Sequence, residues 1–121
     1  MSMRVVSVRG AITVENNTKQ EIILNTKTLL ENIIKKNDIK ITDIISIIFS
    51  VTDDLDEAYP AVAAREIGLT YCSLLCLQEM KVKNSLRKCI RVLLLFNSEL
   101  KQNQVKHIYL KDAVKLRPDL A

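Results

Sequence analysis

The apolar run formed by residues 89–97 is interrupted by a charge at one position, Arg91. A continuous run of branched and aromatic side chains predicts a buried β-strand. A guanidinium group is permanently charged and is rarely fully buried without a partner. The chain must therefore build a sheet in which Arg91 either reaches solvent or meets a group that pairs with it.

Other segments of the chain also have the apolar or β-branched content of strands. They are residues 4–14, 43–51, 70–77 and 105–110. Residues 84–88, just before the strand that contains Arg91, read as a short helix or a turn. The chain thus offers five strands for one sheet.

Two helices are predicted between the first three strands. Thr18 and Glu21 have the spacing of a capping box, in which Thr18 accepts from the third helical amide and Glu21 reaches back. This helix continues to about Lys36 with its isoleucines and leucines on one face. The second helix has Pro60 in its first turn and stops at Gly68.

The order of elements is strand, helix, strand, helix, strand, turn, strand, strand. Strands separated by helices predict an α+β fold of α/β-like order, a mixed β-sheet with helices packed on one face. The length of 121 residues fits a single domain, residues 1–121.

Composition limits the class of partner. The net charge of +4 favours anions in general. Two phenylalanines, three tyrosines and no tryptophan leave few surfaces for stacking bases, so nucleic acid is not indicated. No apolar run approaches the length of a membrane span, and no signal-peptide region is visible. Three cysteines without a CxxC motif predict a reducing compartment, and hence the cytoplasm.

Several kinds of reactive site are poorly supported. The acidic residues within 53–57 lack the spacing and the glycine of a calcium loop, so a solvated turn before the second helix is the better interpretation. Cys72 and Cys76 lie four apart on a strand, and the single His107 completes no zinc motif. Spacing leaves open a nucleophilic pair of Cys76 and His107, which no local motif supports.

The remaining charged and polar candidates are Arg9 and Arg91 inside strands, Glu79 just after the third strand and Tyr109 on the last strand. Taken singly, an arginine on a strand usually faces solvent, and a tyrosine usually packs with its hydroxyl bonded. Taken together with the positive net charge, the four would suit a small dianion held by fixed cations.

Six motifs carry a resemblance to a known family. They are VRGAITVE (8–15), YPAVAARE (59–66), CLQEM (76–80), KCIRV (88–92), HIYL (107–110) and LRPDL (116–120). In this order they resemble the monofunctional bacterial chorismate mutases of the trimeric pseudo-α/β-barrel class. The resemblance implies a homotrimer with active sites in clefts between neighbouring subunits. It also implies conversion of chorismate to prephenate by a Claisen [3,3] rearrangement, in phenylalanine and tyrosine biosynthesis, without metal or cofactor.

The resemblance assigns catalytic and substrate-binding roles by position. Arg91 corresponds to the arginine that faces the ether oxygen of the breaking bond. Glu79 and Cys76 correspond to residues near the ring hydroxyl of the substrate. Arg9 and Tyr109 correspond to the pair that binds the side-chain carboxylate.

Further positions match the walls and the mouth of the family's site. An apolar wall of the site is matched by Tyr59, Ala61, Leu74 and Leu75. Arg65 matches a cation near the mouth. The tail that closes over the site corresponds to residues 116–121 and includes Leu116 and Arg117. Val62 stands where a lysine occurs in the family, Leu75 replaces a small polar residue, and Tyr59 stands for phenylalanine. Asn84 and Ser85 replace a glycine pair.

Two other functions fit the same outline. One is a non-catalytic trimer that binds a small carboxylate at its subunit interface, and the other is a trimer that resembles the imine deaminases. The combination of Arg91, Glu79 and Tyr109 favours chorismate mutase over both.

Overall fold

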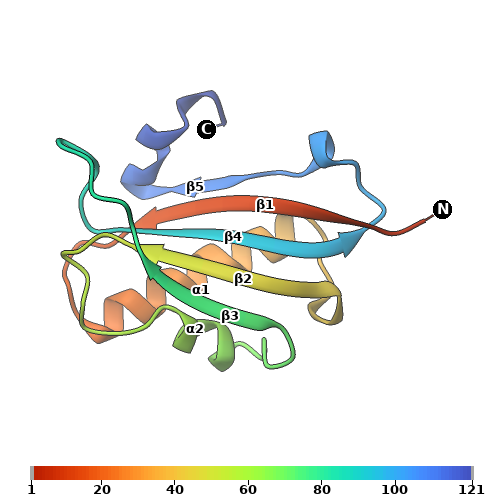
Figure 1. Ribbon diagram of the computed structural model, residues 1–121, viewed down its shortest axis with the longest axis horizontal. Coiled ribbons are helices and arrows are strands. Elements are labelled where there is room, and N and C mark those ends of the chain that lie inside the picture. The colour runs from red at the N-terminus through yellow and green to blue at the C-terminus, as the bar shows by residue number, and fades with distance from the viewer. Residues whose placement is uncertain (1, 121) are drawn as a thin grey trace.

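Five strands form one mixed sheet in the computed structural model, which describes residues 2–120 (Figure 1). The strands are β1 (Arg4–Thr13), β2 (Ile44–Val51), β3 (Ser73–Gln78), β4 (Cys89–Ser98) and β5 (Ile108–Leu110). Their order across the sheet is β3-β2-β4-β1-β5. The central strand β4 is antiparallel to β2 and β1, whereas the edge strands β3 and β5 run parallel to their neighbours. The predicted mixed sheet is confirmed.

Both α-helices lie on one face of this sheet, behind the strands in Figure 1. They are α1 (Lys19–Lys36) and α2 (Ala61–Glu66), and short 3-10 turns occur at η1 (Ile41–Asp43), η2 (Gln102–Gln104), η3 (Lys111–Leu116) and η4 (Pro118–Leu120). The core fills the space between helices and sheet. Its largest fully buried side chains include Ile12, Ile22, Leu29, Ile33, Phe49, Ile90, Leu94 and Phe96. Within residues 2–120, no helix combines the length and the apolar character that crossing a membrane requires.

The first helix is capped differently from the predicted capping box. The Thr18 hydroxyl accepts from the Glu21 amide at 3.2 Å, as predicted. The Glu21 carboxylate, however, accepts from the amide and the side chain of Asn16, at 3.0 and 2.9 Å, and not from the Thr18 amide. The Thr18 amide instead bonds the Asn16 carbonyl, which removes the need for Glu21 there. These bonds from Asn16 lower the pKa of Glu21.

Two predicted strands are shorter than expected. The strand predicted at 105–110 begins only at Ile108, because the Asn37 side chain takes both backbone groups of Lys106, at 2.8 and 3.0 Å. The strand predicted at 70–77 begins at Ser73, after a turn that contains Gly68 at φ 95°. Residues 84–88 form turns and bends and not a helix.

Gly10 sits where β1 meets β5 and α1 without room for a side chain. A Cβ atom there would lie 2.9 Å from the Ile108 carbonyl oxygen and 2.9 Å from Ile33 Cδ1. We expect Gly10→Ala to lower the free energy of unfolding by about 1–3 kcal/mol, because the backbone contact cannot relax as a flexible side chain can. Denaturant unfolding measures the change. Gly68→Ala, which meets no atom within 4 Å but has a positive φ, is the control that isolates backbone strain.

Candidate active site

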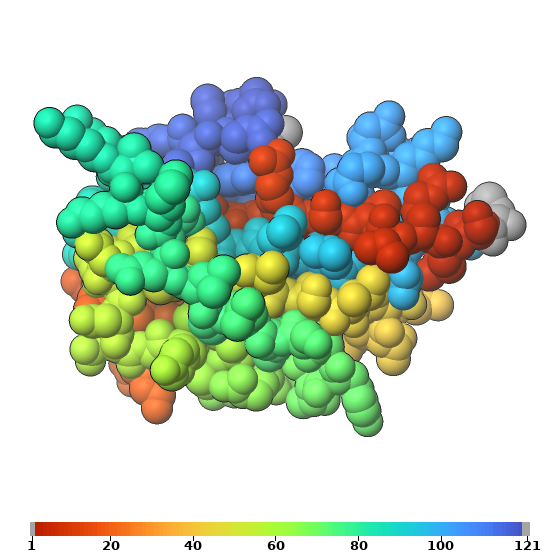
Figure 2. All heavy atoms as spheres, in the orientation of Figure 1, coloured from red at the N-terminus to blue at the C-terminus, as the bar shows by residue number. Residues whose placement is uncertain are grey.

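The sheet face opposite the helices, called the open face here, is turned toward the viewer in Figures 1 and 2. Strand register places Arg91 on β4 directly between Ser50 on β2 and Ala11 on β1. Ala11 is in turn paired with Tyr109 on β5. Paired residues of adjacent strands share a face, so Arg91 lies at the centre of the open face with Tyr109 at its edge.

Arg91 pairs with Glu79. The Arg91 Nε lies 3.4 Å from Glu79 Oε1, and the Ser50 hydroxyl donates to the same oxygen at 2.5 Å. The Glu79 amide donates to the Val51 carbonyl at 2.8 Å, which extends the β2–β3 ladder by one residue. The Arg91 side chain is 45% exposed, so this ion pair adds only about 0–1 kcal/mol to stability. The strand arginine is therefore paired but not buried.

A depression of about 240 Å³ joins the two strand arginines, and we call it the arginine pocket. It is lined by Arg9, Gly10, Ile48, Ser50, Arg91, Val92, Leu93 and Tyr109. Two guanidinium groups and a phenol around one small space are groups that can bind an anion.

The single histidine supports the backbone beside this pocket. His107 Nδ1 accepts from the Arg9 amide at 2.9 Å, where β5 has not yet begun. Burial, together with the nearby Arg9 and Arg117 cations, lowers the pKa of His107. The neutral form, which alone can accept through Nδ1, is favoured.

The C-terminal turns lie beside β5 and β1 (Figure 1). Leu116 and Tyr109 pack against the same small apolar cluster of Ala11, Cys89 and Ala113. Arg117 forms a two-bond pair with Asp119, at 3.1 and 2.8 Å. This pair lowers the pKa of Asp119, with a further contribution from the Arg9 charge. Leu116 and Arg117 thus lie next to the arginine pocket; residue 121 of the predicted tail is outside the described residues.

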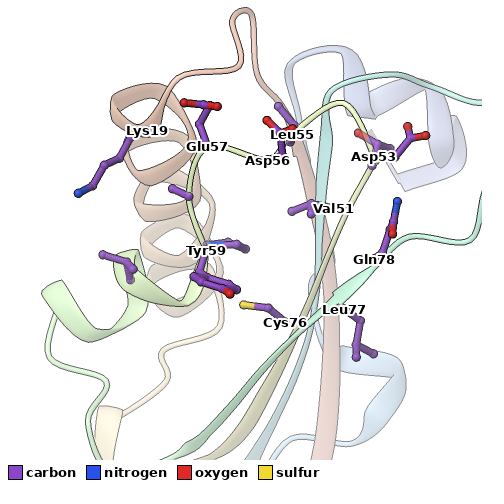
Figure 3. Close-up of a pocket in the computed structure, with 14 residues that line it drawn as sticks. Lys19, Val51, Asp53, Leu55, Asp56, Glu57, Tyr59, Cys76, Leu77 and Gln78 are labelled. Carbon is purple, nitrogen blue, oxygen red and sulfur yellow. The ribbon is translucent and has the colours of Figure 1, made fainter.

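A second set of predicted residues lies on the other side of the sheet. Leu74 and Cys76 on β3 pack against the main core between sheet and helices. Cys76 also lines a cavity of about 750 Å³ with Tyr59 and Val62, and its thiol points toward Tyr59 (Figure 3). The other polar residues that line this cavity are Lys19, Thr52, Asp53, Asp56, Glu57 and Gln78.

The remaining wall and mouth residues are divided between the two faces. Ala61 is buried in α2 and Arg65 is exposed on the same helix. Leu75 points to the open face and is 54% exposed. Cys76 and Glu79, grouped together by the resemblance, lie on opposite faces of the sheet within one chain.

Within one protomer, Cys76 and His107 lie too far apart to form a nucleophilic pair. Cys76 lies on the edge strand β3 and His107 immediately precedes β5 at the other edge. Four strand spacings separate the two edges, about 19 Å. Within residues 2–120, no group of three or more His, Cys, Asp or Glu side chains could hold a metal ion.

Two residues of the open face were missed by sequence reasoning. Ser50 was counted only as part of an apolar strand, although it bonds Glu79 beside Arg91. His107 was weighed as a ligand or a base and not as the acceptor for the Arg9 amide. A hydroxyl near the end of an apolar strand is the one sequence feature that could have pointed to Ser50. Its location beside Arg91, however, depends on the pairing of β2 with β4, which the sequence did not predict.

Comparison with known proteins gives a consistent result. Residues 5–120 match the family described as chorismate mutase type I. Chorismate mutase AroH of Bacillus subtilis (strain 168) is 44% identical over 120 residues, which cover 98% of this chain and 94% of that protein. Chorismate mutase AroH of Thermus thermophilus is 46% identical over 114 residues, 93% of each chain. The structure of a chorismate mutase from Clostridium thermocellum is similar with a TM-score of 0.87 at 48% identity, covering 88% of this chain and 96% of that one.

Proposed function

This chain belongs to the chorismate mutase type I family, and on that premise we propose how its residues act on the substrate. It is an isomerase of aromatic amino acid biosynthesis that converts chorismate to prephenate. The observation that carries the residue assignment is the arginine pocket, where Arg91, held by Glu79, faces the same small space as Arg9 and Tyr109.

Arg91 is the principal catalytic residue of this proposal. In this Claisen rearrangement the C–O bond breaks ahead of C–C bond formation, so negative charge builds on the ether oxygen. A fixed guanidinium stabilises that charge more in the transition state than in the ground state, by about 3–4 kcal/mol if it resembles an oxyanion-hole donor. Glu79 contacts Nε, so the two Nη groups can face the ether oxygen.

Binding and orientation come from the other members of the pocket. Arg9 and Tyr109 hold the side-chain carboxylate, and Leu116 and Arg117 close over it. Glu79 holds the ring hydroxyl while it keeps the Arg91 guanidinium in place. Holding the substrate in its compact conformer adds to the rate, because the reacting carbons are already close together in the bound ground state.

The split of the predicted residues over two faces supports a site shared between protomers. The arginine pocket supplies one half, and Cys76, with Tyr59, Ala61, Arg65 and Leu74, supplies the other half from a neighbour. The open face also carries exposed apolar side chains that a neighbour would cover. They include Val5, Leu75, Leu77 and Leu93. We propose a homotrimeric pseudo-α/β barrel with the helices outside; a stable, active monomer in a solution mass measurement would contradict it.

The direct test of function is an assay of purified protein with chorismate and no added cofactor. We expect the absorbance of chorismate to fall and prephenate to accumulate. A carboxylate-binding protein would bind chorismate without consuming it, and an imine deaminase would release ammonia from an imine and leave chorismate intact. Either of these results would overturn the assignment.

Two further features belong to this proposal. The chain is one domain, and residues 116–120 belong to the tail that closes over the site. A cytoplasmic location is supported by three cysteines that are all free thiols, as expected in a reducing compartment.

Arg9→Ala is expected to raise KM by about 10- to 100-fold with little change in kcat, because it removes a charge-assisted hydrogen bond to a carboxylate that does not react. Steady-state kinetics over a range of chorismate concentrations measure both constants. Arg4→Ala is the matched control, since Arg4 is an exposed arginine at the start of the same strand. An unchanged KM in Arg9→Ala would contradict the carboxylate role.

A further inference from the structure

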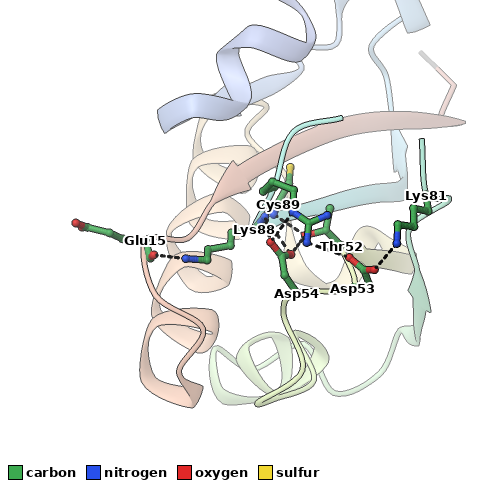
Figure 4. A network of polar contacts seen from close by, with 8 residues as sticks. Glu15, Thr52, Asp53, Asp54, Lys81, Lys88 and Cys89 are labelled. Carbon is green, nitrogen blue, oxygen red and sulfur yellow. Dashed lines mark hydrogen bonds and ion pairs between the residues drawn. The ribbon is translucent and has the colours of Figure 1, made fainter. Parts of the chain in front are cut away.

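The backbone at the entrance to β4 is held by side chains from a distant segment, the turn after β2 (Figure 4). The Lys88 amide donates to both carboxylate oxygens of Asp54, at 3.1 and 2.9 Å. The next amide, of Cys89, donates to the Thr52 hydroxyl oxygen at 3.0 Å. Two successive amides of a loop end are therefore bound by two side chains of one turn.

The remaining bonds make this arrangement complete. The Thr52 hydroxyl also donates a hydrogen bond to the Asp54 carboxylate at 2.5 Å, so it links that carboxylate to the Cys89 amide. The Thr52 amide donates to the Cys89 carbonyl at 3.1 Å, and the Val14 amide donates to the Lys88 carbonyl at 2.8 Å. All four backbone polar groups of Lys88 and Cys89 are thus bound.

The backbone here needs such support. Lys88 has φ 48°, a left-handed conformation that a residue with a side chain seldom adopts. It persists when surrounding contacts hold it. Glycine would adopt this conformation without strain, but residue 88 is a lysine. The hydrogen bonds to Asp54 and Thr52 therefore stabilise a conformation that the lysine itself disfavours.

Asp54 is suited to this role and its neighbour Asp53 is not. The Asp54 side chain is 17% exposed, with Arg87 Nε at 3.3 Å. Burial raises the pKa of its carboxyl, but the bonds from Thr52 and the Lys88 amide and the Arg87 charge outweigh burial and leave it below the ordinary value. Among the described residues, the Asp53 carboxylate by contrast forms ion pairs with the Lys81 and Arg87 side chains, at 3.6 and 3.5 Å, and holds no backbone amide.

Arg91 follows Cys89 by two residues on the same strand and the same face. Its guanidinium is nearly half exposed and has one ion pair, with Glu79 at 3.4 Å, among the described residues. The location of the guanidinium therefore depends largely on the backbone position at the start of β4. Displacing a catalytic group by about 1 Å can cost about a hundredfold in rate.

We propose that Asp54, with Thr52, is a positioning residue for the reaction: the two side chains fix Lys88 and Cys89 and thereby place Arg91 against the breaking bond. This inference rests on the proposed role of Arg91. Asp54 lines neither the arginine pocket nor the cavity that contains Cys76, so it acts through the backbone of β4.

The test compares matched substitutions in the full-length protein. Asp54→Asn keeps the size of the side chain but replaces one acceptor oxygen with an amide nitrogen that cannot accept from Lys88 or Thr52. We expect kcat to fall about 10- to 100-fold with KM within about threefold. Asp38→Asn removes the same charge from an exposed residue that lines neither the arginine pocket nor the cavity that contains Cys76, and its kcat should stay within about threefold of the unaltered protein.

Coupling to Arg91 separates positioning from general damage. In an Arg91→Ala background, Asp54→Asn should lower kcat by less than about twofold, because there is no guanidinium left to misplace. A structural role alone would lower kcat by the same factor in both backgrounds and would overturn the inference. An unimpaired Asp54→Asn beside a severely impaired Arg91→Ala would also overturn it, while a near-normal Arg91→Ala would instead reject the proposed function.

Thr52 provides the test if Asp54→Asn does not fold. Thr52→Val keeps the shape but loses the hydroxyl, so kcat should fall about tenfold. Thr52→Ser retains the hydroxyl and should restore kcat to within about threefold. Equal kcat values for the valine and serine variants, with both folded by thermal unfolding, would contradict the proposal.

Discussion

Arg91→Ala is expected to lower kcat by about a thousandfold or more while the protein stays folded and assembled. The substitution removes the donor proposed to meet the charge on the ether oxygen, and no other described cation on the central strand β4 points to the open face in its place. Stability should change little, because the lost ion pair with Glu79 is largely exposed. Steady-state kinetics and thermal unfolding of the same preparation separate the two effects.

Arg91→Lys is the informative companion variant. Lysine keeps the positive charge but has no planar fork that can contact Glu79 through one nitrogen and the ether oxygen through others. We therefore expect its kcat to remain well below that of the unaltered protein. Near-normal turnover in Arg91→Ala would reject the catalytic assignment, and full activity in Arg91→Lys would reduce the role of Arg91 to simple charge.

Strand alternation predicted which arginines share a face with which neighbours. Alternation along residues 89–97 puts Arg91 on the same face as Cys89, Leu93 and Leu95, and the register of β4 agrees with this. The reason is local: side chains alternate strictly along an extended backbone, so one segment is enough to assign its two faces. The helix boundary near Lys36 was predictable for the same kind of reason, because the apolar stripe and the Asn37 cap are local signals.

Contacts between distant segments were not predictable in this way. Asn37 binds Lys106, and Asp54 binds Lys88, through side chains whose partners lie dozens of residues away. Such bonds depend on how β2, β4 and the loops are assembled, which no local pattern contains. The same limit applies to Ser50 and Glu79, because their meeting follows from the parallel pairing of β2 with β3.

The separation of the two half-sites leads to a prediction about mixed assemblies. Arg91→Ala damages the half formed by the arginine pocket. Cys76→Asp should disable the other half by more than about a hundredfold, because it places a carboxylate beside a dianionic substrate. Cys76→Ser, which introduces no charge, should keep substantial activity, and its complete inactivity would instead point to a covalent role for the thiol.

Co-expression of Arg91→Ala and Cys76→Asp chains with different tags should restore activity that neither chain has alone. If each site takes one half from each of two neighbours, random mixing of equal amounts leaves about one quarter of the sites with both halves intact. Purification through both tags removes the homotrimers, so about one site in three of the purified mixed trimers should be intact, and assay with chorismate measures this fraction. A mixture of Arg91→Ala with Glu79→Ala, both in the same half, should show no recovery. If sites lay within single protomers, the first mixture would be as inactive as the second, and the shared-site proposal would have to be abandoned.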